Sequence, residues 1–382
     1  MTVLADVLDF AGVPERIREP ENERFVTLKL KAAGAVQRVI KDGKTPVPFT
    51  GYRIAAGQFI YSRIDARNGA FALVPDALDG AVVSKDFPIF NVRFGRIEPS
   101  YLLHLMRAGV LQDQIRASSF GATNRQRIAE ATLLSFQIPL PPLPEQRRIA
   151  TILDHADSLR TKRRQVLTHL DSLIESVFRD MFAEVPATST VAAEASLIRT
   201  GPFGSQLLHS EFVDEGIAVL GLDNVVGNKF RWAERRFITP EKYEKLTRYT
   251  VNHGDVLISI MGTTGRCVVV PDDIPTAINT KHICAITPET ERLNPEFLRA
   301  AFLWHPDSLA HLRRQTKGSI MDGLNMGIIK AMPIPVPPLS TQTEFAVRLA
   351  RIESEHETTH AVANHDDELF TSLQSRAFRG DL

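Results

Sequence analysis

The feature that most constrains this chain is a long internal repeat. The segment IPLPPLPEQ at residues 138–146 returns as IPVPPLSTQ at residues 334–342, so that Pro139 lies over Pro335 at an offset of 196 positions. Two more prolines, a leucine and a glutamine match in the same register. Several identities at one offset indicate that a single structural module is used twice.

The match extends in both directions from these prolines. Downstream, SLIESVFRDMF at 172–182 aligns with ELFTSLQSRAF at 368–378 at the same offset. Upstream, YRIAAGQFIYS at 52–62 aligns with YTVNHGDVLIS at 249–259, with the offset larger by one position. The repeat therefore includes nearly the whole chain, and a fold built from two copies of one module is expected.

Each copy of the module has two parts of different character. The first part holds short β-rich runs such as GQFIYSRI and DVLISI, separated by turn-forming residues, and is predicted to form a compact α+β domain. The second part opens with prolines and then lacks Gly and Pro over about 145–182 and 341–378, which predicts a long helix. The expected parts are a first globular domain (1–137), a hinge with the first helix (138–182), a second globular domain (183–333) and a hinge with the second helix (334–382).

The long helical segments are predicted to pack on each other as an antiparallel coiled coil. Their apolar residues recur at spacings of three and four, and Arg163 interrupts the first series. A lone amphipathic helix of this length cannot bury its apolar stripe, so a partner helix is required. The residues predicted to pack between the helices are Ile149, Ile152, Ala156, Leu159, Val166, Leu170, Leu173 and Val177 in the first, and Phe345, Leu349, Ile352, Val362, Leu369 and Leu373 in the second. About 34 helical residues form a rod roughly 50 Å long, which is expected to hold the two globular domains at its opposite ends.

Composition narrows the class of protein. Apolar residues make up 43% of the 382 residues and charged residues 24%, as in globular proteins, and no run approaches the roughly 18 apolar residues of a membrane span. The start MTVLADVLDFAG lacks the pattern of a secretory signal, so a cytoplasmic location is expected. Cys267 and Cys284 have no CxxC or histidine partner at ligand spacing, so we expect reduced thiols and no metal site. The 45 basic and 45 acidic residues cancel, so any DNA binding must come from local concentrations of positive charge.

These segments together resemble a known family, the specificity subunit of type I restriction-modification systems. The strongest resemblance is IPLPPLPEQRRIA at 138–150, supported by GPFGSQ at 201–206 and GDVLISIMGTTGR at 254–266. The stretches GYRIAAGQFIYSRI and GAVVSKDFPIF are similar to another subtype of the same recognition domain. The first domain lacks a segment like GPFGS, and Ser340 and Thr341 replace Pro144 and Glu145, so the two domains are expected to read different half-sequences.

The resemblance implies a non-catalytic protein. In this family two target-recognition domains each contact one half of a bipartite site on double-stranded DNA, and the helices set the unread gap between the halves. The helices also dock two modification (methyltransferase) subunits and, through them, the restriction (translocase and nuclease) subunit. S-adenosylmethionine and ATP are then expected on these partner subunits and not on this chain.

Candidate DNA contacts are cationic and amide side chains on the loops between strands, since such groups hold phosphates and meet base edges. In the first domain the candidates are Lys29, Lys44, Arg63, Arg67, Asn68, Lys85, Arg125 and Arg127. In the second domain they are Ser205, Gln206, Lys229, Arg231, Thr263, Thr264, Arg266, Lys281, His282 and Lys317. Each of these side chains, taken singly, is also compatible with an ordinary solvated surface position.

The sequence offers no catalytic constellation. GPFGSQ and GTTGRC lack the lysine of a phosphate-binding P-loop, and no NPPY, HExxH or GxSxG motif occurs. A metal-dependent nuclease would have to use Pro271, Asp272, Gln315 and Lys317, a loose pattern that arises often by chance. Three alternatives to the specificity subunit stay open at this point: an orphan or regulatory DNA-binding protein of the same fold, such a nuclease, and a protein-interaction scaffold.

Overall fold

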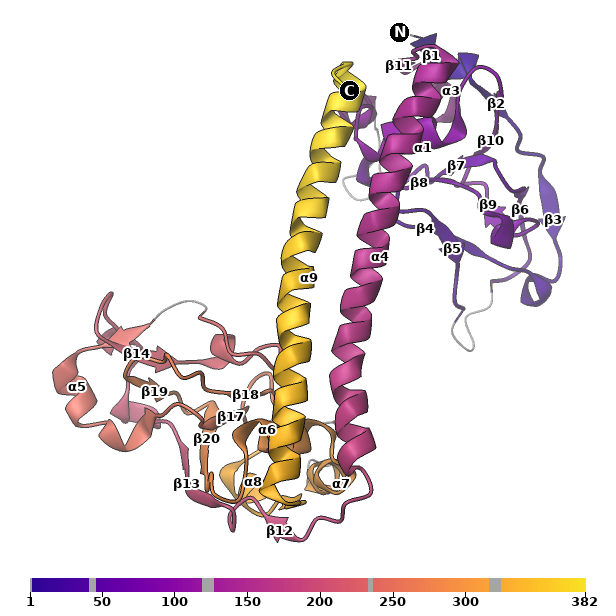
Figure 1. Cartoon of the computed structure of the whole chain (residues 1–382). Helices are drawn as coiled ribbons and strands as arrows, with labels where there is room; N and C mark the ends of the chain where they lie inside the picture. The colour runs from indigo at the N-terminus through magenta and orange to yellow at the C-terminus, as the bar shows by residue number, and fades with distance from the viewer. Residues whose placement is uncertain (1, 41–45, 119–126, 233–235, 316–323) are drawn as a thin grey trace. The chain divides into compact units, whose positions relative to one another are not determined.

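The computed structural model describes residues 2–40, 46–118, 127–232, 236–315 and 324–382 (Figure 1). The chain divides into two compact units. Unit 1 comprises Met1–Arg164 and Ala361–Leu382, and unit 2 comprises Gln165–His360. Two long helices, α4 (Leu143–Phe182) and α9 (Leu339–Arg379), each contribute one segment to unit 1 and one to unit 2.

The described part of unit 1 combines antiparallel sheets with short helices. Its strands are β1 (Thr2–Val3), β2 (Leu8–Phe10), β3 (Glu15–Ile17), β4 (Val26–Leu28), β5 (Ala35–Gln37), β6 (Phe49–Arg53), β7 (Phe59–Tyr61), β8 (Phe71–Leu73), β9 (Val82–Ser84), β10 (Ile89–Val92) and β11 (Gln137–Ile138). Its short helices are α1 (Pro99–Arg107), α2 (Gln112–Ser118) and α3 (Glu130–Leu134). The sheets have the orders β2-β10-β7-β8, β3-β6-β9, β4-β5 and β1-β11.

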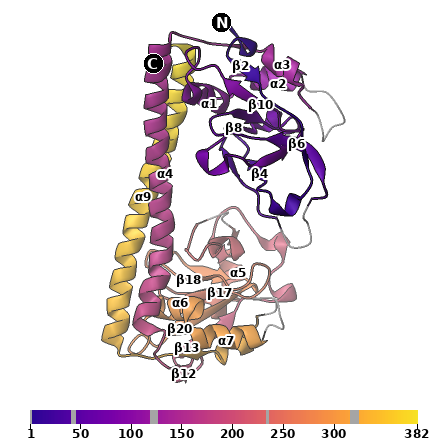
Figure 2. The same ribbon diagram turned by 90° about the vertical axis from the view of Figure 1, so that its right-hand side faces the viewer.

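Unit 2 has a similar inventory. Its strands are β12 (Ser189–Thr190), β13 (Ala195–Thr200), β14 (Ile217–Leu220), β15 (Phe237–Ile238), β16 (Thr250–Val251), β17 (Val256–Ser259), β18 (Cys267–Val269), β19 (Ala277–Asn279), β20 (Ile283–Pro288) and β21 (Pro333–Ile334). Its short helices are α5 (Pro240–Glu244), α6 (Pro295–Trp304), α7 (Pro306–Gln315) and α8 (Met326–Lys330). Helix α6 packs against β17 and β18 (Figure 2).

The sequence repeat is a structural repeat. The antiparallel order β2-β10-β7-β8 of unit 1 returns in unit 2 as β13-β20-β17-β18, and the small β1-β11 pair returns as β12-β21. Helices α1 and α6, α3 and α8, and α4 and α9 begin 196 positions apart. The predicted α+β architecture with two β-rich domains and two long helices is thereby confirmed.

The two units differ in their remaining sheets. Unit 1 has the antiparallel β3-β6-β9 and β4-β5 sheets, whereas unit 2 has β15-β14-β19-β16, in which β14 and β19 are parallel. The divergence lies in the region between the shared strands. The common sheet is thus a constant scaffold, and each copy carries its own second sheet.

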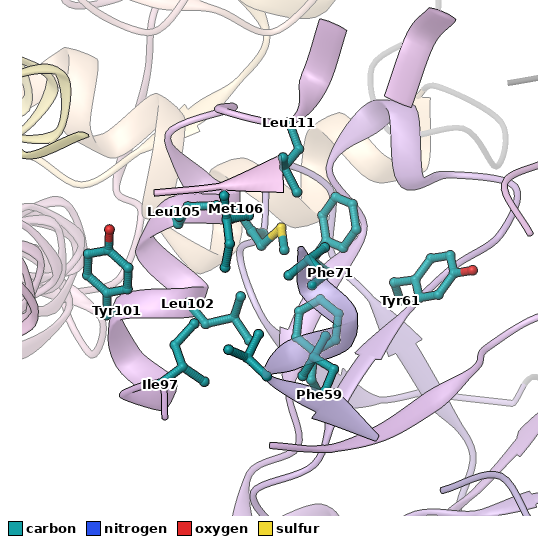
Figure 3. Packing of buried hydrophobic residues seen from close by; sticks show 14 of the residues in the cluster. Phe59, Tyr61, Phe71, Ile97, Tyr101, Leu102, Leu105, Met106 and Leu111 are labelled. Atoms are coloured by element: carbon teal, nitrogen blue, oxygen red, sulfur yellow. The ribbon is translucent and has the colours of Figure 1, made fainter. Parts of the chain in front are cut away.

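The core of unit 1 lies between the shared sheet and α1. Phe59, Tyr61 and Phe71 from β7 and β8 are fully buried and pack with Leu102 and Leu105 of α1 (Figure 3). The rings of Phe59 and Phe71 stack with centroids 6.0 Å apart. Burying each such side chain stabilises the fold by about 1.5–3 kcal/mol, so this cluster fixes the position of α1 on the sheet.

The two cysteines belong to the core of unit 2. Cys267 and Cys284 are free and fully buried. Burial raises the pKa of both thiols, that of Cys284 to about 12. The prediction that both cysteines belong to the core is confirmed.

The glutamine that ends each proline-rich motif joins the long helix to its globular domain. Gln146 Oε1 accepts a hydrogen bond from the backbone N–H of Glu98 at 2.8 Å, and its Nε2 donates to the carbonyl oxygens of Arg96 (3.2 Å) and Pro141 (2.8 Å). Both glutamines are buried, with exposed fractions of 1% and 0%. Gln342 makes the same three hydrogen bonds, to Asn294, Arg292 and Pro337 at 2.8, 2.9 and 2.8 Å.

The long helices pack antiparallel within each unit. In unit 1, Ile149 and Leu153 near the start of α4 share a core with Phe370 and Ala377 near the end of α9. In unit 2, Phe178 and Phe182 at the end of α4 meet Phe345 at the start of α9, with ring centroids 5.5 and 5.7 Å apart. The predicted antiparallel pairing of the helices is confirmed.

Ionisable side chains also contact each other across the helix pair within each unit. Arg160 Nε contacts Asp367 Oδ1 at 2.6 Å, and Arg163 Nε contacts Asp366 Oδ2 at 3.3 Å. In unit 2, His356 Nε2 lies 3.1 Å from Asp171 Oδ1. Arg160 and His356 are repeat mates, as are Asp171 and Asp367, so each helix supplies the base to one contact and the acid to the other.

The predicted set of packing residues needs correction. Ile149, Ala156, Val177, Phe345, Leu349 and Leu373 do belong to the cores, and Ile152, Leu170 and Ile352 are partly buried. Five others are more than a third exposed: Leu159, Val166, Leu173, Val362 and Leu369. The prediction followed one continuous stripe, but each helix end packs on its own globular domain as well as on the other helix. The buried positions are therefore displaced to residues such as Leu153, Phe178, Phe182 and Phe370.

Candidate nucleic-acid interface

Three loops of unit 2 meet around one cavity. The cavity has a volume of about 320 Å³ and is lined by the GPFGSQ segment, the turn after β14, Arg236 and the turn between β19 and β20. Among the sequence candidates, Lys281 and His282 line it directly. Ser205 and Gln206 lie exposed in the short 3₁₀ helix Gly204–Gln206, which also contributes Gly204 to the lining.

Two glycines allow these loops to approach so closely. A Cβ atom on Gly201 would lie 2.0 Å from the carbonyl oxygen of Asn279, so a larger residue would push the GPFGSQ segment off the β19–β20 turn. Gly262 has φ of +74°, and a Cβ there would lie 2.8 Å from a methyl group of Leu222. The Gly-rich motifs thus bring the loops together through backbone fit.

The cavity is lined by positively charged side chains, one of which is paired with an acidic residue. Arg236 pairs with Asp223, and both line the cavity. Burial, together with the neighbouring Lys281 and Arg236, lowers the pKa of His282 below its usual range. His282 is therefore a neutral hydrogen-bonding group at pH 7, and the cations of the site are Lys281 and Arg236.

The other candidates of unit 2 lie on two neighbouring loops. Arg266 is exposed next to Thr263 and Thr264 in the β17–β18 turn. Lys229 and Arg231 follow Asn228, whose side chain accepts a hydrogen bond from the backbone N–H of Cys267 at 3.0 Å. That bond ties the 228–231 loop to the first residue of β18, directly after the turn that carries Arg266.

Unit 1 gathers part of its candidates at one end of β7 and β9. Arg63 follows β7 and pairs with Glu130, while its backbone N–H donates to the carbonyl of Asp86 at 2.9 Å. Arg127 contacts the Asp86 carboxylate at 3.2 Å, and Lys85 is exposed beside it. Arg63, Lys85 and Arg127 are therefore brought together, with two acids among them.

The remaining candidates of unit 1 form a second group. Lys29 is exposed after β4, and its backbone N–H donates to Gly34 across the β4–β5 turn. Arg67 and Asn68 lie in the 3₁₀ helix Ala66–Asn68, which Gly69 follows. The carbonyls of Asn68 and Gly69 accept hydrogen bonds from the backbone N–H groups of Lys31 and Ala32 of that same turn. Lys44, Arg125 and Lys317 lie outside the described residues.

Sequence reasoning missed several residues around these loops. Arg236 and Asp223 of the cavity, and Arg107 and Arg299 beneath the loops, carry no motif and were not singled out. Asp223 and Arg236 are thirteen positions apart in the sequence, so no local pattern could pair them. Within the described residues no group of three His, Cys, Asp or Glu side chains is placed to hold a metal ion. The Asp272 carboxyl of the nuclease alternative is fully exposed beside His253.

Comparison with known proteins identifies the family. The model of the type I restriction modification DNA specificity domain matches residues 41–169 and 221–364, once in each copy of the repeat and over more than half of the chain. The chain belongs to this family. It therefore carries two DNA specificity domains, and its predicted class, a non-catalytic specificity subunit rather than an enzyme, is that of the family.

Individual relatives agree with this assignment. The chain is 23% identical over 380 residues to the type I restriction enzyme EcoBI specificity subunit of Escherichia coli, a match that covers 90% of this chain and 79% of that protein. It is 22% identical to the MjaVIII specificity subunit of Methanocaldococcus jannaschii over 66% of this chain, and that match spans 63% of the relative's length.

Solved structures share the fold. The type I restriction-modification S subunit from M. genitalium aligns with a TM-score of 0.60 at 13% identity, covering 99% of this chain and 95% of that one. A chain from a structure of type I restriction-modification complex assembly aligns with a TM-score of 0.57 at 18% identity, covering 100% and 97%. The described helices are also all too short or too polar to cross a lipid bilayer.

Proposed function

We propose that this specificity subunit reads a bipartite DNA sequence, with unit 1 contacting one half-site and unit 2 the other. The observation that carries the proposal is the structural repeat: one constant sheet occurs twice, and each copy bears a different second sheet and different polar loops. Two unlike surfaces on one repeated scaffold suit a site with two unlike halves. Lys85 and Lys281, which are repeat mates, are candidate contacts in equivalent turns.

The long helices are proposed to set the gap between the half-sites. Helices α4 and α9 are unbroken over 40 and 41 residues, which corresponds to roughly 60 Å at 1.5 Å per residue. Half-sites on one face of the duplex are about 34 Å apart per helical turn, within the span of such helices. Removing one turn from both helices, about 5.4 Å, is then expected to shorten the gap by about one or two base pairs.

Partner subunits are proposed to bring the chemistry. Val166 and Leu173 are exposed at heptad spacing on the part of α4 that belongs to unit 2, and their exposed fractions of 45% and 43% leave apolar surface for a docking partner. We propose that two modification subunits dock on the helices, that a restriction subunit associates through them, and that S-adenosylmethionine and ATP bind to those partners. Because the proposed ligand is DNA, we propose that the complex acts in the cytoplasm.

Methylation mapping tests the proposal directly. The full chain is co-expressed with its modification subunit in a host without other methyltransferases, and the modified bases of the genome are sequenced. We expect one motif made of two short half-sites with a constant gap, absent when this gene is deleted. Methylation without sequence preference, or a single uninterrupted motif, would contradict the proposal.

Matched variants then assign the half-sites. Lys85→Ala is expected to weaken selection at one half-site only, and Lys281→Ala at the other, because the two lysines occupy equivalent turns of different units. Lys245→Ala removes the same charge from an exposed position at the end of α5 and serves as the control. If both variants relax the same half-site, the assignment of one half-site to each unit is wrong.

A further inference from the structure

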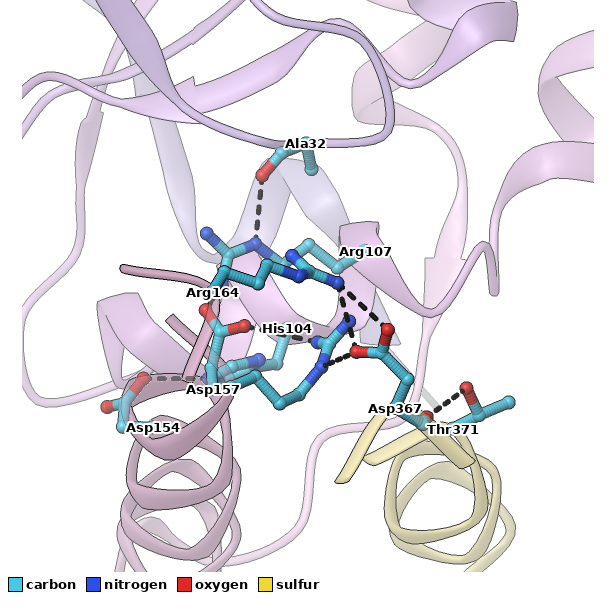
Figure 4. A network of polar contacts seen from close by, with 9 residues as sticks. Ala32, His104, Arg107, Asp154, Asp157, Arg164, Asp367 and Thr371 are labelled. Carbon is cyan, nitrogen blue, oxygen red and sulfur yellow. Dashed lines mark hydrogen bonds and ion pairs between the residues drawn. The ribbon is translucent and has the colours of Figure 1, made fainter. Parts of the chain in front are cut away.

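An arginine in unit 1 links a candidate DNA-contact loop to a long helix. Arg107, at the end of α1, donates from Nε to the carbonyl oxygen of Ala32 at 2.8 Å. Its Nη1 contacts the carboxylate of Asp157 on α4 at 2.9 Å (Figure 4). Ala32 is fully buried in the β4–β5 turn and has φ of 49°, a conformation that few non-glycine residues adopt.

Unit 2 contains the same three-part link. Arg299 of α6 donates from Nη1 to the carbonyl oxygen of Asn228 at 2.9 Å, and its Nη2 contacts Glu353 of α9 at 3.0 Å. Asn228 has φ of 58°. A further contact, from Nε to Glu296 at 2.7 Å, holds the guanidinium, which is only 6% exposed.

The ends of the two links are repeat mates, but the arginines are not. Ala32 and Asn228 are 196 positions apart, and so are Asp157 and Glu353. The position equivalent to Arg299 in unit 1 is Leu103, four residues before Arg107 on α1. Residues four apart lie on one face of a helix, so arginines one turn apart reach the same two partners.

The loop end of each link touches the segments that carry candidate DNA contacts. In unit 1, the backbone N–H of Ala32 donates to Gly69, directly after Arg67 and Asn68. In unit 2, Asn228 precedes Lys229 and accepts from Cys267, directly after Arg266. A displacement of either loop would therefore move an arginine that is hydrogen-bonded to a long helix.

We infer that Arg107 and Arg299 are positioning residues that hold the DNA-contact loops of their own unit in a fixed relation to the long helices. The inference rests on the proposed function for its consequence in DNA binding, but not for the link itself. The arginine fork suits this role because its N–H groups point in fixed directions toward two acceptors at once. A loop ordered before binding loses less conformational entropy when DNA docks.

The first experiment needs no DNA. Hydrogen exchange of the full chain is compared between the parent protein, Arg107→Ala and Asp157→Asn, with the amides of Lys31 and Ala32 as reporters, since both donate to the segment at 68–69. We expect faster exchange at these amides and unchanged exchange in β7 and β10 for both variants. Unchanged reporters would overturn the inference, and so would acceleration spread evenly through unit 1.

The second experiment measures DNA binding by the chain in complex with its modification subunit. The probes are duplex oligonucleotides that carry the mapped site, with either half scrambled in turn. Arg107→Ala is expected to weaken binding about tenfold through one half-site, and Arg299→Ala through the other. Glu353→Gln replaces Arg299→Ala if the buried arginine is needed for folding.

Arg147→Ala is the matched control. Arg147 is an exposed cation of α4 that contacts Glu98, the N-cap residue of α1, at 3.5 Å, so neither exchange in the β4–β5 turn nor half-site affinity should change. If the parent complex shows no bipartite binding, the proposed function fails while hydrogen exchange still decides the link. If the parent binds and Arg107→Ala weakens both half-sites equally, the positioning role is wrong.

Discussion

Replacing the buried glutamine of each proline-rich motif should loosen the attachment of a long helix to its globular domain. Gln342 is completely buried, and its amide satisfies the backbone N–H of Asn294 and the carbonyls of Arg292 and Pro337. Gln342→Ala removes three hydrogen bonds and leaves their backbone partners unpaired. At about 1 kcal/mol for each bond, the expected loss in free energy of unfolding is about 3 kcal/mol.

Gln146→Ala should cost nearly the same, because Gln146 makes the equivalent three bonds in unit 1. Guanidinium denaturation followed by circular dichroism gives the free energy, and exchange of the Glu98 and Asn294 amides shows which junction has opened. The control is Gln165→Ala, at an exposed position of α4, where a change within about 0.5 kcal/mol is expected. Parent-like stability of both buried variants would refute the role given to the repeated glutamine.

Three further predictions concern buried polar groups. Burial lowers the pKa of His104, although the nearby Asp154 carboxylate acts in the opposite direction, so the folded protein binds fewer protons than the unfolded chain. The stability should therefore be intact above about pH 6.5 and fall as the pH drops toward the folded-state pKa. His104→Gln should reduce this pH dependence, which is measured as the difference between denaturation midpoints at pH 7.5 and 5. Arg199→Met should cost about 3–5 kcal/mol in urea denaturation because it leaves the fully buried Asp255 carboxylate without its cation, although Asn252 and Thr287 still donate hydrogen bonds to it, whereas Arg348→Ala at an exposed pair should cost about 0–1 kcal/mol. Cys267 and Cys284 should resist iodoacetamide at pH 8 in the native protein and react after denaturation, as read by mass spectrometry, since burial raises both thiol pKa values; rapid native labelling would contradict their burial.

The repeat allowed the fold to be predicted because the strongest identities lie where the helix joins the globular domain. In the first copy the Gln146 side chain donates to the carbonyl oxygen of Pro141, and in the second copy Gln342 donates to that of Pro337. The residues that make the sequence motif recognisable are therefore the ones that form the junction. The packing between the helices could be predicted only in part. An apolar period does not show that Phe370 and Phe178 pack on globular domains as well as on the partner helix.

The candidate site was predictable at the level of loops but not of side-chain partners. Lys281, His282 and the GPFGSQ segment could be nominated because turn residues mark the loops, and the structure brings them to one cavity. Arg236 and Asp223 could not, since their pairing depends on the path of the chain between β14 and β15. The carbonyl groups of Ala32 and Asn228 carry no sequence signal at all, because every residue has such an acceptor.

The contrast between the two arginine links shows what the repeat has kept. Neither arginine is at the other's equivalent position, yet the loop carbonyl and the carboxylate that they join are repeat mates. At the offset of 196, Arg107 pairs with Leu303 and Arg299 with Leu103, although both arginines reach from the short helix to equivalent partners. A geometric requirement at the ends, rather than inheritance of one residue, explains this pattern. The requirement falls where a loop that differs between the two copies meets a long helix that both copies share, so the ends of the link are kept while the loops differ.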